Sequence, residues 1–337
     1  MKTKHIPVAR ESDPALLIGL WDLRTEPLIL GGMLDLVTEL HCRSVADGVV
    51  LSGLCLIWDK DHLPPGGLPT PTTRSLTPIT DQALGHSPIM ITAKNIDGIG
   101  DCYSAGSIAA IRDFLEREQG RYITWPKLSE DETPLGHEYH FTHNIHDFFR
   151  DHDYLPQWSF KADSMEGAND FLRDHVASSL AVIVHAKNDP LRRGTENSRI
   201  EVWAEFMRRN QSDDHIKFVV IGNDNVDALR DIPGVVITQD FGNDLTRDIA
   251  LIKIGDAFMG TASGPAQMAI LGDRPYAIYK PIHIYPESMA REFGDGPGYP
   301  FAGPGQHFFR IDPTPDDLSE ALCLLRTASV NDGQRVK

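Results

Sequence analysis

The stretch AFMGTASGPAQMAIL, residues 257–271, joins an apolar strand-like run to an apolar helix-like run through six small or rigid residues. Two interpretations fit this pattern. The first is a tight strand-to-helix turn, in which Ser263 caps the helix and Pro265 occupies its first turn. The second is an anion site, in which small side chains let the phosphates of a ligand reach the N–H groups of a helix N-terminus. Capping alone does not account for the small residues at 260–262 and 264, so we favour the anion site.

Strand-like and helix-like segments alternate on both sides of this stretch. In the second half we expect strands at 180–187, 216–222, 235–240, 257–262 and 275–280, and helices near 197–209, 225–231, 245–254, 264–271 and 314–328. In the first half we expect strands at 15–22, 48–59 and 121–126, a helix at 31–45, and a strand, a glycine-rich turn and a helix within 89–118. Nearly continuous apolar strands predict parallel sheets covered by helices on both faces.

The length of the chain indicates how these elements divide. Its 337 residues exceed what one hydrophobic core usually holds, so we expect two domains. An irregular segment at 127–160 separates the two alternations, and a helix candidate at 164–178 follows it. We therefore predict an α/β fold of two Rossmann-like domains whose parallel sheets face a central cleft, with the chain divided into residues 1–160 and 161–337.

The charge of the chain excludes one class of partner. Lysine and arginine total 32 against 48 aspartates and glutamates, which gives a formal net charge of -16. Such a surface repels a polyanion, so we expect no nucleic-acid partner. A small phosphorylated ligand remains compatible with this charge, because a local cluster of cations can outweigh the field of the whole protein.

Cysteine spacing and hydropathy bear on the compartment. Cys42, Cys55, Cys102 and Cys323 form no CxxC pair, which is typical of free thiols in a reducing compartment. No apolar run reaches the length of a membrane span, and the first residues lack the apolar core of a signal peptide. We therefore expect a cytoplasmic protein with no membrane span.

In open α/β sheets, ligands bind beyond the carboxyl ends of the strands. Candidate ligand-binding residues lie at this end of three strands of the second half. At the end of the strand at 180–187 and in the loop that follows lie His185, Lys187, Asp189, Arg192 and Arg193, a dense cationic group or an ordinary solvated loop. After the next strand come Gly222, Asn223 and Asp224, which are either ligand contacts or a turn that caps a helix. The third place is the opening stretch, with Thr261, Ser263 and Gly264.

The first half carries weaker signals. The loop NIDGIGDCYSAG, residues 95–106, lacks the GxGxxG spacing of a dinucleotide fingerprint. Asp22 and Arg24 follow the first strand and form either part of a site or a structural ion pair. Histidines recur at 137, 140, 143, 146 and 152, but no HExxH pattern occurs, so we expect incidental histidines and no metal site.

Three quoted segments of the second half carry a resemblance to a known family. HAKNDPLRRG (185–194), FVVIGND (218–224) and DLTRDIALIKIGDAFMGTASGPAQMAIL (244–271) resemble the donor-binding half of GT-B glycosyltransferases, most of all bacterial polysaccharide-type and fucosyltransferase-like members. The resemblance implies that His185 and Lys187 stand at that group's His-x-Arg pair and that Ser263 and Gly264 stand at its diphosphate turn. Lys187 lacks the planar fork of arginine, so we expect Arg192 or Arg193 to supply bidentate phosphate contacts.

The resemblance also implies an activity. It makes the first domain the acceptor side and the second the nucleotide-sugar side of a polysaccharide-biosynthesis glycosyltransferase. The acceptor would be a hydroxyl of a glycan, a lipid-linked sugar or a small molecule. In direct displacement, Asp22 or Asp101 would act as base, and fixed cations would replace a metal, with no cofactor. Two alternatives remain: a nucleotide-sugar epimerase or hydrolase on the same fold, and a non-catalytic binding or scaffold protein on a decayed transferase fold.

Overall fold

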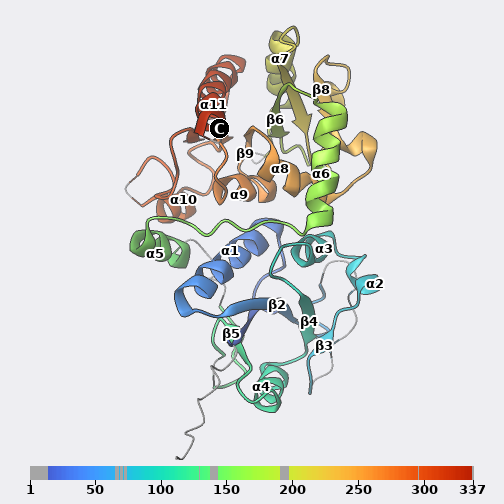
Figure 1. Ribbon diagram of the computed structural model, residues 1–337, viewed down its shortest axis with the longest axis vertical. Coiled ribbons are helices and arrows are strands. Elements are labelled where there is room, and N and C mark those ends of the chain that lie inside the picture. Colours follow the sequence, from blue (N-terminus) through green and yellow to red (C-terminus); the bar gives the residue numbers. More distant parts are fainter. Residues whose placement is uncertain are drawn as a thin grey trace, which may run out of the picture.

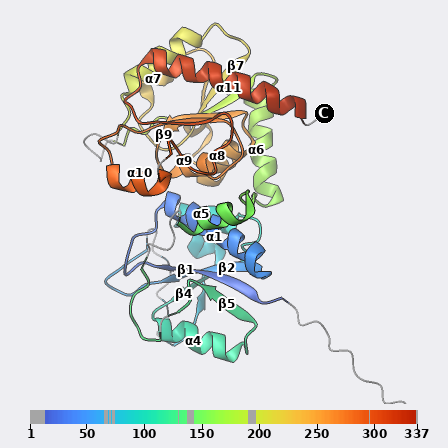
Figure 2. The ribbon, with the colours of Figure 1, turned by 90° about the vertical axis from the view of Figure 1, so that its left-hand side faces the viewer.

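The computed structural model describes residues 14–64, 68, 71, 74–128, 130–136, 143–189, 197–294 and 296–335. The first half of the chain builds one sheet and the second half builds another. The two sheets follow one another along the long axis of the molecule, and each carries helices on its faces (Figures 1 and 2). The predicted α/β class with two Rossmann-like, mostly parallel sheets is confirmed.

The first sheet has the strand order β3-β4-β2-β1-β5 and is parallel except where β3 pairs with β4. Its strands are β1 (Leu16–Asp22), β2 (Val50–Ile57), β3 (Thr77–Pro78), β4 (Asp101–Ala105) and β5 (Tyr122–Trp125). The helices of this half are α1 (Leu30–Asp47), α2 (Asp81–Leu84), α3 (Pro88–Lys94), α4 (Ile108–Arg117) and α5 (His143–His152). Along β1, Leu17 and Trp21 belong to the core shared with α1, whereas Ile18 and Leu20 pack with α4. Both faces are covered, which explains the continuous apolar run.

The second sheet has the order β11-β10-β9-β6-β7-β8, with every paired neighbour parallel. Its strands are β6 (Leu180–His185), β7 (Ile216–Val220), β8 (Val235–Ile237), β9 (Ala257–Thr261), β10 (Tyr276–Tyr279) and β11 (Gln306–Phe309). Its helices are α6 (Ala162–His175), α7 (Ile200–Asn210), α8 (Leu245–Ile254), α9 (Gly264–Ile270), α10 (Pro286–Phe293) and α11 (Pro315–Arg335), with 3₁₀ turns η2 (Asp227–Leu229) and η3 (Thr238–Phe241). In β6, Val182 and Val184 pack with α7 and α11, and Ile183 packs with α8 and α9.

The two halves meet through helices. α1 packs against α9, and α3 packs against α8, where the hydroxyls of Thr92 and Thr246 lie 3.2 Å apart. One cluster of buried apolar side chains continues across this contact and includes Leu36 of α1 and Met268 of α9. Figure 2 shows α1 directly below α9 and α10. The division of the chain after residue 160 stays our proposal.

Several segments differ from the prediction, and the helix expected near 225–231 is only the 3₁₀ turn η2. The apolar run at 89–95, expected as a strand, lies mostly in α3, which begins at Pro88 and packs on α1 and α8. A short apolar run suits a buried helix as well as a strand, and proline at the first helical position favours the helix. The segment expected to be irregular contains α5, and residues 281–313, for which we expected no element, contain α10 and β11.

Candidate functional site

The second sheet gathers the candidate residues at one place along its edge. The chain continues from β6 to β7 and β8 on one side and to β9, β10 and β11 on the other, so the strand order reverses between β6 and β9. In open α/β sheets, ligands bind at this switch point, beyond the carboxyl ends of the strands. His185, the last residue of β6, pairs in register with Gly260 of β9. The turns after these two strands therefore lie side by side.

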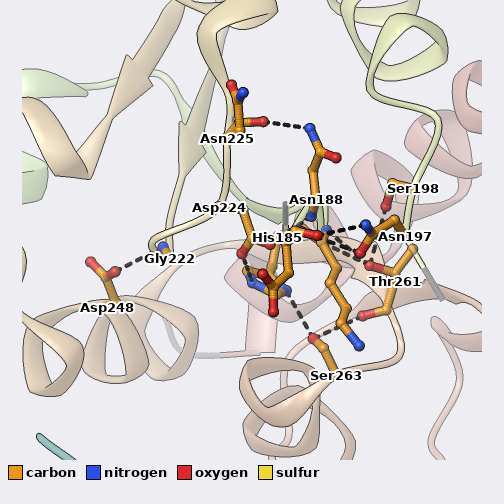
Figure 3. A network of polar contacts seen from close by, with 12 residues as sticks. His185, Asn188, Asn197, Ser198, Gly222, Asp224, Asn225, Asp248, Thr261 and Ser263 are labelled. Atoms are coloured by element: carbon orange, nitrogen blue, oxygen red, sulfur yellow. Dashed lines mark hydrogen bonds and ion pairs between the residues drawn. The ribbon is translucent and has the colours of Figure 1, made fainter. Parts of the chain in front are cut away.

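His185 is buried and is held at both ring nitrogens (Figure 3). Its Nδ1 lies 2.8 Å from Oγ of Ser263, and its Nε2 lies 3.1 Å from Oδ2 of Asp224. The N–H of Asn188 donates to the other carboxylate oxygen at 2.6 Å. Burial acts to raise the pKa of Asp224, but the contact with His185 and the Asn188 N–H lower it below its usual range. The imidazole therefore joins the turns after β6, β7 and β9.

Gly222 makes room for this imidazole. It turns the chain after β7 with a φ of +94°, a conformation that side chains rarely adopt, and its N–H donates to Oδ2 of Asp248 at 2.9 Å. A Cβ at this position would lie 2.9 Å from Cδ2 of His185. The next residue, Asn223, lines the cavity described below. The glycine is thus required by both the turn and the buried histidine.

Thr261 ties two loops together. Its hydroxyl accepts the N–H of Lys187 at 3.1 Å and lies 3.3 Å from Oγ of Ser198 (Figure 3). These contacts fix the backbone that follows β6, and Lys187 itself lines the cavity. Thr261 therefore positions a cationic residue at the switch point.

Ser263 does not act as the predicted helix cap. It occupies the N-cap position of α9, but its side chain makes no capping hydrogen bond. Its hydroxyl instead contacts His185 and donates to the carbonyl of Thr261 at 3.0 Å. The capping prediction is wrong because these tertiary and local contacts compete for the same hydroxyl.

Gly264 is small for a reason that the sequence did not reveal. A Cβ at this position would lie 3.0 Å from Cβ of Leu30, in the first turn of α1. Close packing of the two halves thus favours glycine whether or not a ligand binds. In the same turn, Ala262 donates its N–H to the carbonyl of Tyr279 at 3.0 Å, so this N–H is not available to an anion. Pro265 has no N–H, and the groups of this turn that could bind an anion are therefore the N–H groups at 263 and 264.

These turns open on a cavity of about 650 Å³ that both halves of the chain line. The second half contributes polar and cationic residues, including His185, Lys187, Asn223, Asp224, Ser263 and Lys280. The first half contributes residues 29–32 and Asp35. α1 begins in this wall without a side-chain cap, and the first N–H groups of a helix have no partner within it. The positive end of an 18-residue helix therefore faces the cavity.

Asp35 is the carboxylate that our sequence analysis missed. It is buried at 5% exposure and accepts a hydrogen bond of 2.6 Å from Nε2 of Gln267 in α9. Burial and then the charge of Glu292 raise the pKa of Asp35 well above its usual range, against the hydrogen bond from Gln267. One signal could have found it, because Asp35 interrupts the apolar face of the helix in GGMLDLV, residues 31–37. A raised carboxyl pKa in a cavity is typical of a group that exchanges protons.

The two carboxylates predicted as bases lie elsewhere. Asp22, at the carboxyl end of β1, is fully buried, pairs with the guanidinium of Arg24 at 2.7 Å and accepts the N–H of Leu135 at 3.0 Å. Asp101 is exposed at the first residue of β4, because the glycine-rich turn precedes that strand, and its carboxylate accepts from the hydroxyl of Tyr103. Neither side chain lines the cavity. The structure favours the ion-pair alternative for Asp22.

We expect Asp22→Asn to lower the free energy of unfolding by about 2 kcal/mol, because it removes a buried charge-assisted pair with Arg24. Urea denaturation monitored by circular dichroism measures this change. Asp101→Asn is the matched control, since its exposed side chain predicts a change within about 0.5 kcal/mol. Equal stability of the two variants would contradict the structural role of Asp22.

The remaining sequence candidates contribute less to this picture. Arg192 and Arg193 lie outside the described residues, as do His137 and His140. His143, His146 and His152 lie on α5, and among the described residues no group of three or more histidines, cysteines and acids is arranged to hold a metal ion. The basic residues that line the cavity within the described part of the chain are therefore His185, Lys187 and Lys280.

Comparison with solved structures identifies this arrangement. The heptosyltransferase WaaC of E. coli, solved with ADP, matches with a TM-score of 0.52 and 9% sequence identity, over 92% of this chain and 99% of WaaC. The chain has the GT-B fold. The expected resemblance is confirmed at this level, and the cavity lies between the two domains of a GT-B architecture.

Two other solved structures are similar at lower scores. The E. coli ADP-heptose LPS heptosyltransferase II matches with a TM-score of 0.46 and 12% identity, over 94% of this chain and 99% of its own. The NodZ α-1,6-fucosyltransferase co-crystallized with GDP matches with a TM-score of 0.38 and 10% identity, over 77% of this chain and 93% of its own. No family model matches the sequence, and no curated protein matches it.

Asp35 predicts a pH dependence of stability for this GT-B chain. Its pKa is higher in the folded than in the unfolded protein, so its contribution to stability is lost as pH rises from the ordinary carboxyl range through the folded pKa. Asp35→Asn removes this loss. The difference in unfolding free energy, variant minus wild type, should grow with pH by about 1.4 kcal/mol for each unit of pKa elevation. Urea denaturation across pH measures it, and a difference independent of pH would contradict the assignment.

Proposed function

We propose that this protein is a glycosyltransferase that moves a sugar from a nucleoside-diphosphate donor to an acceptor hydroxyl. One observation carries the proposal. A single interdomain cavity combines a cationic wall from the second half with a buried carboxylate, Asp35, from the first half. Displacement at an anomeric carbon needs these two kinds of group, because negative charge develops on the leaving diphosphate while the acceptor hydroxyl loses a proton.

In this proposal the second half holds the donor. Lys187 and Lys280 neutralise the diphosphate, and the turn at 263–264 and the N-terminus of α1 direct backbone N–H groups toward it. His185, fixed between Ser263 and Asp224, keeps the three turns in register beneath the ligand. These fixed groups stabilise the leaving diphosphate, so the proposed mechanism uses no metal and no cofactor.

The first half supplies the base. The acceptor oxygen attacks the anomeric carbon, the bond from that carbon to the diphosphate oxygen breaks, and the hydroxyl proton passes to the carboxylate of Asp35. Because the pKa of Asp35 is raised, its carboxylate is a stronger proton acceptor than an ordinary aspartate. We propose Asp35 for this role in place of Asp22 and Asp101, since Asp35 lines the cavity.

The proposal extends to acceptor and compartment. We propose a glycan, lipid-linked or small-molecule acceptor in polysaccharide biosynthesis, in keeping with the bacterial polysaccharide-type resemblance. Cys42, Cys55, Cys102 and Cys323 are free thiols, which supports a reducing compartment such as the cytoplasm. Within the described residues, no helix has the length and apolar character needed to cross a membrane.

Ligand screening followed by product analysis tests the proposal. ADP, GDP and UDP, and sugars attached to each, are screened for a rise in melting temperature, since a ligand that binds the native state stabilises it. ADP comes first because WaaC was solved with it. The stabilising nucleotide sugar is then incubated with and without a panel of sugar acceptors. Acceptor-dependent release of nucleotide with a new glycoside supports the transferase. Release without acceptor supports a hydrolase, an altered donor sugar supports an epimerase, and binding without turnover supports a scaffold protein.

A further inference from the structure

A second carboxylate lines the same cavity from the opposite half of the chain. Glu292 lies in the last turn of α10, in the second half, whereas Asp35 belongs to α1 in the first. The hydroxyl of buried Tyr299, which also lines the cavity, donates a hydrogen bond to Oε2 of Glu292.

The charged and polar groups around the two carboxylates differ. Three groups act on the pKa of Asp35: Gln267 of α9, Glu292 of α10 and, along its own helix, Glu39, and none of these is a cation. Glu292 is surrounded differently, because Tyr299 and three cations favour its ionised form: Lys280, Arg291 and Arg310. Burial raises the pKa of Glu292 above its usual range, and these four groups limit that rise. Of the two carboxylates, Glu292 therefore has more neighbouring groups that favour its ionised form.

We propose, building on the proposed function, that Glu292 is a positioning residue that strengthens Asp35 as a base across the domain interface. A negative charge at Glu292 disfavours the ionised form of Asp35 and favours its protonated form. The protonated form arises when Asp35 takes the proton of the acceptor hydroxyl. Glu292 thereby stabilises the protonated Asp35 that the reaction produces. This effect depends on the two halves lying close together, because Asp35 of α1 and Glu292 of α10 line the same cavity. Base strength is thus coupled to the approach of the two halves.

The proposal has a signature that simple structural damage lacks. Glu292→Gln removes the charge but keeps the size of the side chain and an acceptor for the Tyr299 hydroxyl. Asp35 then ionises at lower pH and becomes a weaker base. The acid limb of the pH–rate profile should move to lower pH while the plateau rate falls, whereas a merely destabilised protein loses rate without moving the limb. Tyr299→Phe should shift the limb in the same direction by a smaller amount, because Glu292 then protonates more readily.

A double-mutant cycle in stability tests the coupling without any substrate. Unfolding by urea is followed across pH for wild type, Asp35→Asn, Glu292→Gln and the double variant. The change in unfolding free energy caused by Asp35→Asn should vary less with pH in the Glu292→Gln background than in the wild-type background. Glu287→Gln is the matched control, since Glu287 is exposed at the start of the same helix and should leave this variation unchanged. The same variation with pH in both backgrounds would overturn the proposal.

The pH–rate profile is then measured with the nucleotide sugar that raises the melting temperature most. A limb displaced to lower pH in Glu292→Gln supports the inference, and a limb at the wild-type position overturns it. A coupling in the stability cycle together with no turnover of any nucleotide sugar would reject the proposed function while leaving the carboxylate pair established. The two failures are therefore distinguishable.

Discussion

Asparagine in place of Asp35 should lower the rate of sugar transfer by about 10²- to 10⁴-fold while leaving nucleoside-diphosphate affinity within a few-fold of wild type. The substitution keeps the size of the side chain and an oxygen for the hydrogen bond from Gln267, but it removes the group that takes the acceptor proton. A loss in kcat with unchanged donor binding is the kinetic result expected when a transition-state interaction alone is removed. Steady-state kinetics and calorimetry with the nucleoside diphosphate measure the two quantities.

Asp22→Asn and Asp101→Asn are the controls for this experiment. Both change a first-half carboxylate by the same chemistry, but neither side chain lines the interdomain cavity. Under conditions in which each variant is folded, both should keep a rate within a few-fold of wild type. Transfer by Asp35→Asn at the wild-type rate would remove Asp35 from the role of base. A selective loss in Asp22→Asn or Asp101→Asn would restore the assignment made from the sequence.

Methionine in place of Lys187 should weaken binding of the nucleoside diphosphate by about 10²-fold, because truncating one partner of a desolvated charge pair costs about 2–5 kcal/mol. Methionine retains most of the apolar stem and removes the charge that faces the diphosphate in the proposed complex. The N–H of Lys187 that donates to Thr261 is unchanged by the substitution, so the turn should keep its conformation. Isothermal titration calorimetry measures the affinity.

Two comparisons make this second prediction specific. Lys217→Met, near the amino end of β7 and thus at the opposite edge of the sheet, should bind as tightly as wild type. Binding of the nucleoside without phosphates should be equal in wild type and Lys187→Met, because the lost interaction involves phosphate alone. A Lys187→Met protein that binds the diphosphate with wild-type affinity would place the anion elsewhere in the cavity.

Prediction from the sequence succeeded where short-range patterns carry the information. Apolar runs followed by glycine, asparagine or serine located β6, β7 and β9 and the turns beyond them, and those turns do meet at the switch point, whereas β11 of the same sheet was not expected. It failed at 89–95, because a run of seven residues suits a helix or a strand and packing against α1 and α8 decided between them. The same error misplaced Asp101. We expected a strand before the glycine-rich turn, which put Asp101 beyond the end of a strand, whereas Asp101 is the first residue of β4.

By itself, the sequence determined the α/β class, the two parallel sheets and the small-residue turn at 260–264, because these follow from periodicity and side-chain size within a few residues. The tertiary structure alone decided what faces the cavity. Asp35 meets Gln267 across 232 positions of the chain, and Gly264 is small because Leu30 of the other half packs against it. Ser263 binds His185 instead of capping its helix for a similar reason. Contacts between residues so far apart depend on how the two halves pack, and no local pattern encodes that packing.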